Sequence, residues 1–109
     1  MHLRFTEKYV RQAPDQPGIF CLWHHADLVY VGRTAPRTTL KEELDHALTM
    51  AMAGDMSATH FSYETTNSPK TRAAEELRDY FERWGSLPRY NECAPVHHEG
   101  ALQRAGREA

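Results

Sequence analysis

The sequence contains seven histidines and two cysteines, the side chains that most often hold transition metals or act as nucleophiles. The histidines are His2, His46, His60 and two adjacent pairs, His24 with His25 and His97 with His98. None of these spacings is typical of a metal site, and Cys21 and Cys93 form no CxxC motif. We therefore expect free thiols, with Cys21 in the core, and we look for the chemistry of this chain elsewhere.

Two glycine-containing triplets lie on either side of a polar turn, GIF at 18–20 and YVG at 30–32. The apolar runs 18–23 and 28–31 have the length of strands. About four polar residues separate them, which predicts a β-hairpin that places the two triplets on paired strands.

Helices are expected before and after this hairpin. A short helix around 6–12 is stopped by Pro14 and Pro17. A longer helix begins at Thr38 or Thr39, because Glu42 completes a capping box with Thr39. It carries an apolar stripe at helical spacing and ends at Gly54. The stripe consists of Leu40, Leu44, Ala47, Leu48 and Ala51.

The second half of the chain predicts a strand, a helix and an extended segment. Residues 58–65 alternate, so Phe61 and Tyr63 are expected on one buried face. Ser68 and Pro69 predict a helix start, and Gly85 its end. The segment 87–91 is expected to be extended. We expect the large aromatic residues Trp23, Phe61, Tyr80, Phe81 and Trp84 in the core.

The triplets GIF and YVG, together with this element order and the segment PRYN at 88–91, resemble the GIY-YIG nuclease family. The resemblance covers roughly residues 14–91. It implies an α/β (α+β) fold in which a small three-stranded antiparallel sheet is flanked by helices, in agreement with the pattern of the sequence.

The resemblance also implies metal-assisted hydrolysis of phosphodiester bonds. In this family a glutamate on a helix holds one divalent cation, usually magnesium, which stabilises the charge on the phosphate. A tyrosine or a nearby basic residue activates water. An arginine on the helix after the hairpin holds the scissile phosphate.

Three positions of this chain match the motif of the family, and a fourth departs from it. Tyr30 stands at the second tyrosine and is expected to orient or activate water. Phe20 replaces the first tyrosine and keeps the ring without the hydroxyl. Arg33 directly follows the second triplet and is expected to contact phosphate. Asn91 matches the terminal asparagine, which ties the site segment together in the family.

The acidic position falls on Glu75 or Glu76. A helix turns about 100° per residue, which places Glu76 about 85° and Glu75 about 175° from the centre of the apolar stripe. Glu76, at the border of the buried face, is therefore the expected ligand of Mg²⁺ or Mn²⁺, and Glu75 is expected to point to water. The alternative is that Glu76 is an ordinary solvated acid.

The helix arginine is missing from this chain. Aligned by the leucines of LKEEL at 40–44, Glu43 stands in its place, which reverses the charge beside a phosphate site. Lys41 or Arg37 is a candidate replacement, and Glu43 is alternatively a second cation ligand beside Glu76. Arg37, Lys41 and Arg72 are the candidate substrate-binding residues of a weak basic face, unless they are scattered surface charges.

Length and composition predict one domain over 1–92 and a flexible tail over 93–109. The net charge of −2 excludes a strongly basic protein that binds nucleic acid unspecifically, but not a local basic face. The chain has no apolar run long enough to cross a membrane and no recognisable signal peptide, so we expect a cytoplasmic protein.

Three functions remain open. The first is a metal-dependent endonuclease that acts on DNA rather than RNA, with help from a partner protein or a second copy. The second is a degenerate relative that binds nucleic acid or a protein without cleavage, in agreement with Phe20 and Glu43. The third is an interaction module whose surface is formed by the region around Met50, Met52 and Met56 together with the flexible tail. The alternative for these methionines is core packing.

Overall fold

The predicted hairpin is present in the structure, a computed structural model that describes residues 2–92. It consists of β2 (Gly18–His24) and β3 (Asp27–Arg33). Only His25 and Ala26 remain in the turn, and His25 adopts a positive φ of 56°. Each strand is therefore longer than its apolar run. The expected tail 93–109 and its residues Cys93, His97 and His98 lie outside the described residues.

The hairpin belongs to a four-stranded antiparallel sheet of order β1-β4-β2-β3. β4 (His60–Thr65) pairs with β2, and β1 (Leu3–Arg4) pairs with β4. The expected α+β class is confirmed, whereas the expectation of three strands is wrong by one. Because β1 has only two residues, it carries no alternating pattern that sequence analysis can detect.

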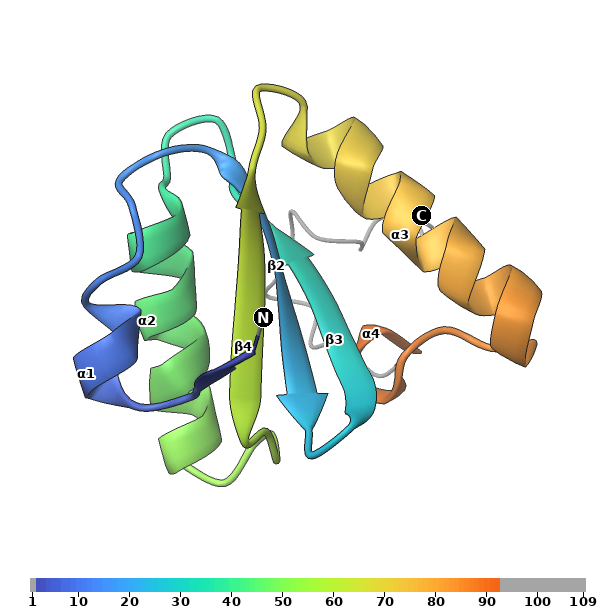
Figure 1. The fold of residues 1–109 in the computed structure, drawn as a ribbon, viewed down its shortest axis with the longest axis horizontal. Coiled ribbons are helices and arrows are strands. Elements are labelled where there is room, and N and C mark those ends of the chain that lie inside the picture. Colours follow the sequence, from blue (N-terminus) through green and yellow to red (C-terminus); the bar gives the residue numbers. More distant parts are fainter. Residues whose placement is uncertain (1, 93–109) are drawn as a thin grey trace.

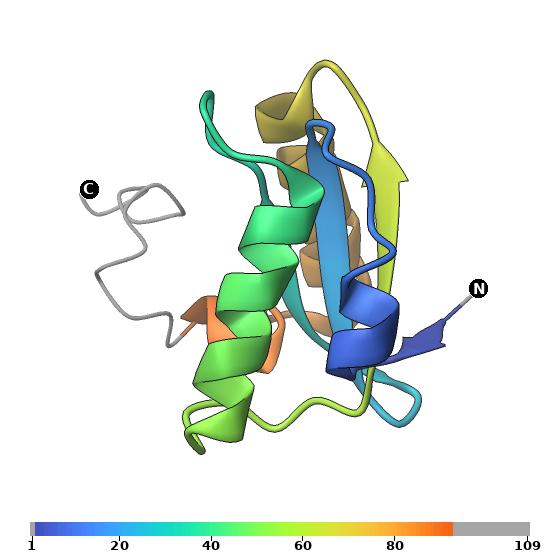
Figure 2. The ribbon, with the colours of Figure 1, turned by 90° about the vertical axis from the view of Figure 1, so that its left-hand side faces the viewer.

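One face of the sheet is covered by α1 (Glu7–Val10) and α2 (Leu40–Met52), as Figures 1 and 2 show. The predicted capping box is present, because Thr39 accepts from the backbone N–H of Glu42 while the Glu42 carboxylate accepts from that of Thr39. The largest core cluster lies between α2 and this face. Its best-buried side chains are Leu22, Leu40, Leu44 and Phe61.

The other face is covered by α3 (Pro69–Trp84), which begins at Pro69 and ends at Gly85 in the left-handed conformation, as predicted. Only its first half joins the core, where Ala73 and Leu77 pack on Ile19 and Val31. Farther along, α3 diverges from β3 (Figure 1). The expectation of buried aromatic residues is therefore wrong here: Phe81 is 52% exposed and Trp84 64% exposed. Trp23 and Tyr80 are half-buried, and Phe61 is fully buried.

Two local expectations also differ from the structure. Tyr63 is 40% exposed, because within residues 2–92 the outer side of β4 is paired only with the two residues of β1. The segment expected to be extended forms the short helix α4 (Arg89–Glu92), which packs against β3. Among the described residues, no helix is both long enough and apolar enough to cross a membrane.

Candidate functional site

The two triplets of the hairpin form one tightly packed unit. Phe20 is paired with Gly32, and a Cβ atom built on Gly32 would lie 2.3 Å from the Phe20 ring. A Cβ atom on Gly18 would lie 2.3 Å from the Glu64 carbonyl oxygen and 2.8 Å from the Leu40 side chain. Any larger residue at either position would overlap these atoms, so both close contacts require glycine. The Phe20 and Tyr30 rings lie on the same face, with centroids 6.0 Å apart.

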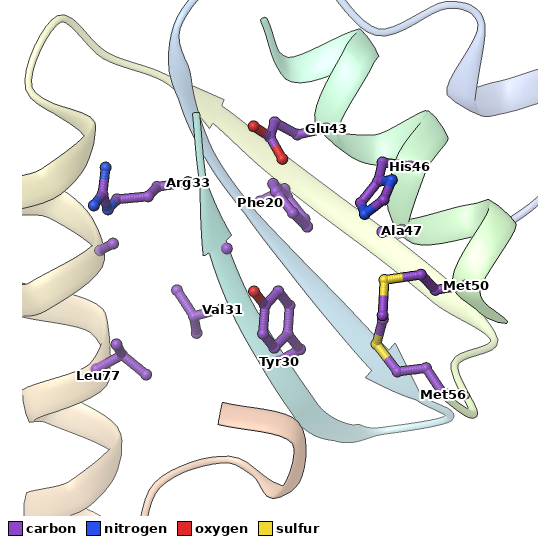
Figure 3. Close-up of a pocket in the computed structure, with 12 residues that line it drawn as sticks. Phe20, Tyr30, Val31, Arg33, Glu43, His46, Ala47, Met50, Met56 and Leu77 are labelled. Atoms are coloured by element: carbon purple, nitrogen blue, oxygen red, sulfur yellow. The ribbon is translucent and has the colours of Figure 1, made fainter. Parts of the chain in front are cut away.

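A pocket of about 50 Å³ lies beside these rings, along β3. Because β3 is the last strand of the sheet, α2 on one face and α3 on the other both contribute to the pocket. Figure 3 shows Glu43 and His46 projecting from α2, while Arg33 points toward α3. The sequence predictions placed Phe20, Tyr30 and Arg33 in one site, and all three line this pocket.

Tyr30 is 5% exposed. Burial raises the pKa of its phenol well above the ordinary value, the negative charge of Glu43 raises it further, and Arg33 lowers it in part. The phenol therefore keeps its proton at neutral pH. In this state Tyr30 is able to donate a hydrogen bond, but it is a poor base for activating water.

Glu43 occupies the position where the resemblance implied an arginine, and it lines the pocket. Its carboxylate accepts a hydrogen bond of 2.8 Å from the Thr38 hydroxyl. Glu43 also lies in the first turn of α2, where the helix dipole stabilises a negative charge. The carboxylate is thus held at the pocket by its surroundings, and it opposes the binding of an anion there.

Asn91 does not line the pocket but fixes the strand that carries it. Its Nδ2 donates to the Val31 carbonyl at 2.9 Å, and its Oδ1 accepts from the Val31 N–H at 2.8 Å. The neighbouring Tyr90 hydroxyl accepts a hydrogen bond of 2.9 Å from the Ser57 N–H. α4 therefore holds the outer edge of β3, and Asn91 positions the site rather than contacting a ligand in it.

Glu76 lies apart from this pocket. Its carboxylate accepts from Arg72 at 2.8 Å, and Arg72 also binds Glu75 at 3.0 Å and Glu64 at 2.8 Å. The hydrogen bonds that Arg72 donates to Glu64, Glu76 and Glu75 raise the pKa of its guanidinium, and the hydrogen bond from Arg72 lowers the pKa of Glu64. Glu76 is less exposed than Glu75, 35% against 45%, as the helical angle predicted. Glu75 nevertheless binds Arg72 instead of pointing freely to water.

The expected basic residues do not gather at the pocket. Arg37 is exposed, and Lys41 makes an ion pair of 3.9 Å with Asp15. Neither lines the pocket, so neither replaces the missing arginine there. Arg72, the third candidate, is held by its three carboxylates.

The residues at Glu76 do not fit a resident magnesium or manganese ion in this arrangement. The carboxylate that would bind the cation already accepts a hydrogen bond from Arg72. Within residues 2–92, no three histidine, cysteine, aspartate or glutamate side chains come together as a metal site. Glu43 and Glu76 do not line the same pocket, so the alternative of a joint cation site is not supported by the geometry.

Sequence reasoning missed three pocket residues, His46, Met50 and Met56. The sequence held a signal for two of them, because His46 follows Glu43 by three residues and Met50 follows His46 by four, which places all three side chains on one face of the helix. Cys21 is a free thiol, as expected, but it is half-buried against the cluster of Ile19, Val31 and Ala73 rather than fully inside the core. Burial, and next the nearby Glu76 carboxylate, raise the pKa of its thiol to about 12.

Comparisons of this chain with protein families, with curated proteins and with solved structures find no match.

Proposed function

We propose that this domain binds nucleic acid, DNA in preference to RNA, on a GIY-YIG-like scaffold and without cleaving it. One observation carries the absence of cleavage. The carboxylate of Glu76 is bound to Arg72, while Tyr30 and Arg33 line a different pocket. A centre that hydrolyses a phosphodiester bond needs these groups around one phosphate.

The electrostatics of the pocket support the same proposal. Glu43 brings a negative charge to the place where a phosphate would be held, and repulsion at short range is strong in a partly buried site. Tyr30 keeps its proton at neutral pH, and Phe20 has no hydroxyl. Neither aromatic ring of the pocket is therefore able to act as a base, while Arg33 brings a positive charge to the lining.

The class of ligand rests on the resemblance of the two triplets and of the PRYN segment to a nuclease family. The proposal includes a partner protein or a second copy of the chain, because a domain of this size has little surface for selecting a DNA sequence. It also includes a cytoplasmic location.

A second candidate is a metal-dependent DNA endonuclease. It is favoured by the common pocket of Tyr30 and Arg33, on a strand that Asn91 holds in place. This candidate requires that Arg72 release Glu76 when Mg²⁺ or Mn²⁺ and substrate bind.

One experiment separates the two candidates. The protein is incubated with plasmid, branched and single-stranded DNA and RNA, with Mg²⁺ or Mn²⁺, and both cleavage and gel retardation are measured. We expect retardation of DNA without cleavage, and tighter binding by Glu43→Arg because a negative charge is replaced by a positive one.

The Glu76→Ala and Glu75→Ala variants serve as a matched pair, since both carboxylates bind Arg72. Cleavage that is lost in Glu76→Ala and kept in Glu75→Ala would establish the endonuclease. A protein that neither retards nor cleaves any of these substrates would contradict both candidates.

A further inference from the structure

The second half of α3 exposes large aromatic rings beside arginines. Trp84 is 64% exposed and Phe81 52% exposed, while Tyr80 is half-buried and lies 6.2 Å from Trp84 between ring centroids. Arg83 directly precedes Trp84, and Arg89 follows in α4. Exposed aromatic rings among arginines are typical of surfaces on which unpaired bases stack.

Tyr80 and Trp84 border a groove rather than a flat surface. The groove has a volume of about 870 Å³, within the range of roughly 300–1,000 Å³ that is common for clefts that bind small ligands. α3 forms one wall, and the turn end of the hairpin forms the other. Trp23, Tyr80 and Trp84 are its aromatic lining residues. Phe81 lies on the same helix but does not line it.

The charges in the groove are of both signs. Arg83 and Arg89 are the lining cations that phosphate groups would contact, and Asp27 and Asp79 are the lining carboxylates. The third carboxylate, Glu76, is bound by Arg72. Arg72 is shared by Glu76, Glu75 and Glu64, so its single charge does not cancel theirs. With two arginines and three carboxylates the groove lining is slightly acidic, which opposes a long stretch of phosphate backbone and leaves the base as the part of a nucleotide that the groove favours.

We propose that this groove binds one unpaired base of single-stranded DNA, stacked on Trp84. This inference rests on the proposed function for the class of ligand and names the place where the ligand binds. Asp79 and Asp27 accept hydrogen bonds from the exocyclic amino group of cytosine or adenine, which thymine lacks. The groove therefore favours oligo(dC) over oligo(dT).

The test is the affinity of the full chain for fluorescein-labelled oligo(dC), measured by anisotropy. We expect Trp84→Ala to weaken binding by about 5- to 150-fold, the effect of removing one stacked ring. Phe81→Ala is the matched control, because Phe81 is a similarly exposed ring outside the groove. This control is expected to bind as wild type does. Circular dichroism checks that both variants stay folded.

The specificity is tested in the same assay. Wild type is expected to bind oligo(dC) more tightly than oligo(dT), and Asp79→Asn is expected to reduce the difference. Equal loss of binding in Trp84→Ala and Phe81→Ala would overturn the groove as the site. Free cytidine monophosphate that binds as tightly as oligo(dC) would overturn the assignment to a single strand.

Failure of this proposal is distinguishable from failure of the proposed function. If wild type and Trp84→Ala bind duplex and single-stranded DNA equally well, the groove is not the site and the nucleic-acid function stands. If wild type binds no nucleic acid, both proposals fail. Binding of a peptide library but not of oligonucleotides would assign the groove to a protein partner instead.

Discussion

Asn91 forms two hydrogen bonds with the backbone of Val31, one to its carbonyl and one from its N–H, across 60 residues of sequence. In this way a side chain takes the place of a neighbouring strand at the outer edge of β3, the edge strand of the sheet formed by residues 2–92. The same edge borders the pocket of Tyr30 and Arg33. α4, the last described helix, therefore holds β3 in position beside the pocket, although none of its residues lines the pocket.

Asn91→Ala is expected to lower the free energy of unfolding by about 2 kcal/mol or more, because it leaves two buried backbone groups without partners. Urea unfolding followed by circular dichroism measures the loss. Asn67→Ala is the control, since Asn67 is exposed and should change stability by less than about 0.5 kcal/mol. Equal stability of the two variants would show that the contact between Asn91 and Val31 contributes nothing.

Gly32→Ala is expected to destabilise the protein by about 1–3 kcal/mol, because the added methyl group overlaps the Phe20 ring and forces the core to shift. Thermal unfolding measures this effect. The double variant Phe20→Leu with Gly32→Ala should lose less than the sum of the single changes, because leucine lacks the ring atoms that the methyl group meets. Additive losses would contradict a direct contact between the two positions.

The buried phenol of Tyr30 predicts a loss of stability at alkaline pH. In the unfolded chain this group loses its proton near the ordinary pKa of 10.0, whereas in the folded protein burial and Glu43 keep it protonated. Its contribution is therefore complete below pH 10.0 and declines as the pH rises above that value. Urea unfolding at a series of pH values measures the decline.

Tyr30→Phe should weaken this alkaline decline, because no proton remains to be lost at that position. Tyr63→Phe is the matched control and should keep it, since Tyr63 is 40% exposed. An alkaline decline of the same size in wild type and in Tyr30→Phe would mean that the phenol is not responsible.

The ion pairs of Arg72 predict a loss of stability in acid. Arg72 lowers the pKa of Glu64 below its ordinary value of 4.5, so the stabilisation is present above that pH and is lost as the pH falls further. Arg72→Gln should lower stability at neutral pH by about 1 kcal/mol, as expected for partly exposed pairs. It should also reduce the loss in acid, measured by urea unfolding at a series of pH values.

Arg78→Gln is the control for this change, because Arg78 is an exposed arginine of the same helix outside the cluster. High salt should reduce the difference between wild type and Arg72→Gln, since exposed charges are screened. A difference that does not change with salt or with pH would contradict an electrostatic origin.

Local patterns of the sequence determined the hairpin, α2 and α3. The capping box of Thr39 and Glu42 acts within four residues, and Pro69 and Gly85 act through their own backbone angles, so each is readable without tertiary structure. The placement of Phe20 and Tyr30 on one face follows from the alternation of side chains along paired strands. By contrast, the two-residue β1 forms only because β4 offers a free edge beside it.

The tertiary structure alone decided that Phe81 and Trp84 are exposed and that Arg72 bridges to β4. The apolar stripe in the sequence predicts the angle at which each residue projects from α3. It does not predict how far along the helix the sheet continues to cover it. The sheet packs against α3 as far as Leu77, so Phe81 and Trp84 stay exposed, and Trp84 lines a groove. The angle likewise placed Glu76 beside the buried face. Its ion pair with Arg72 follows from the spacing of four residues within the helix. The bridge from Arg72 to Glu64 on β4 depends on how α3 crosses the sheet, and no spacing within the helix encodes that second contact.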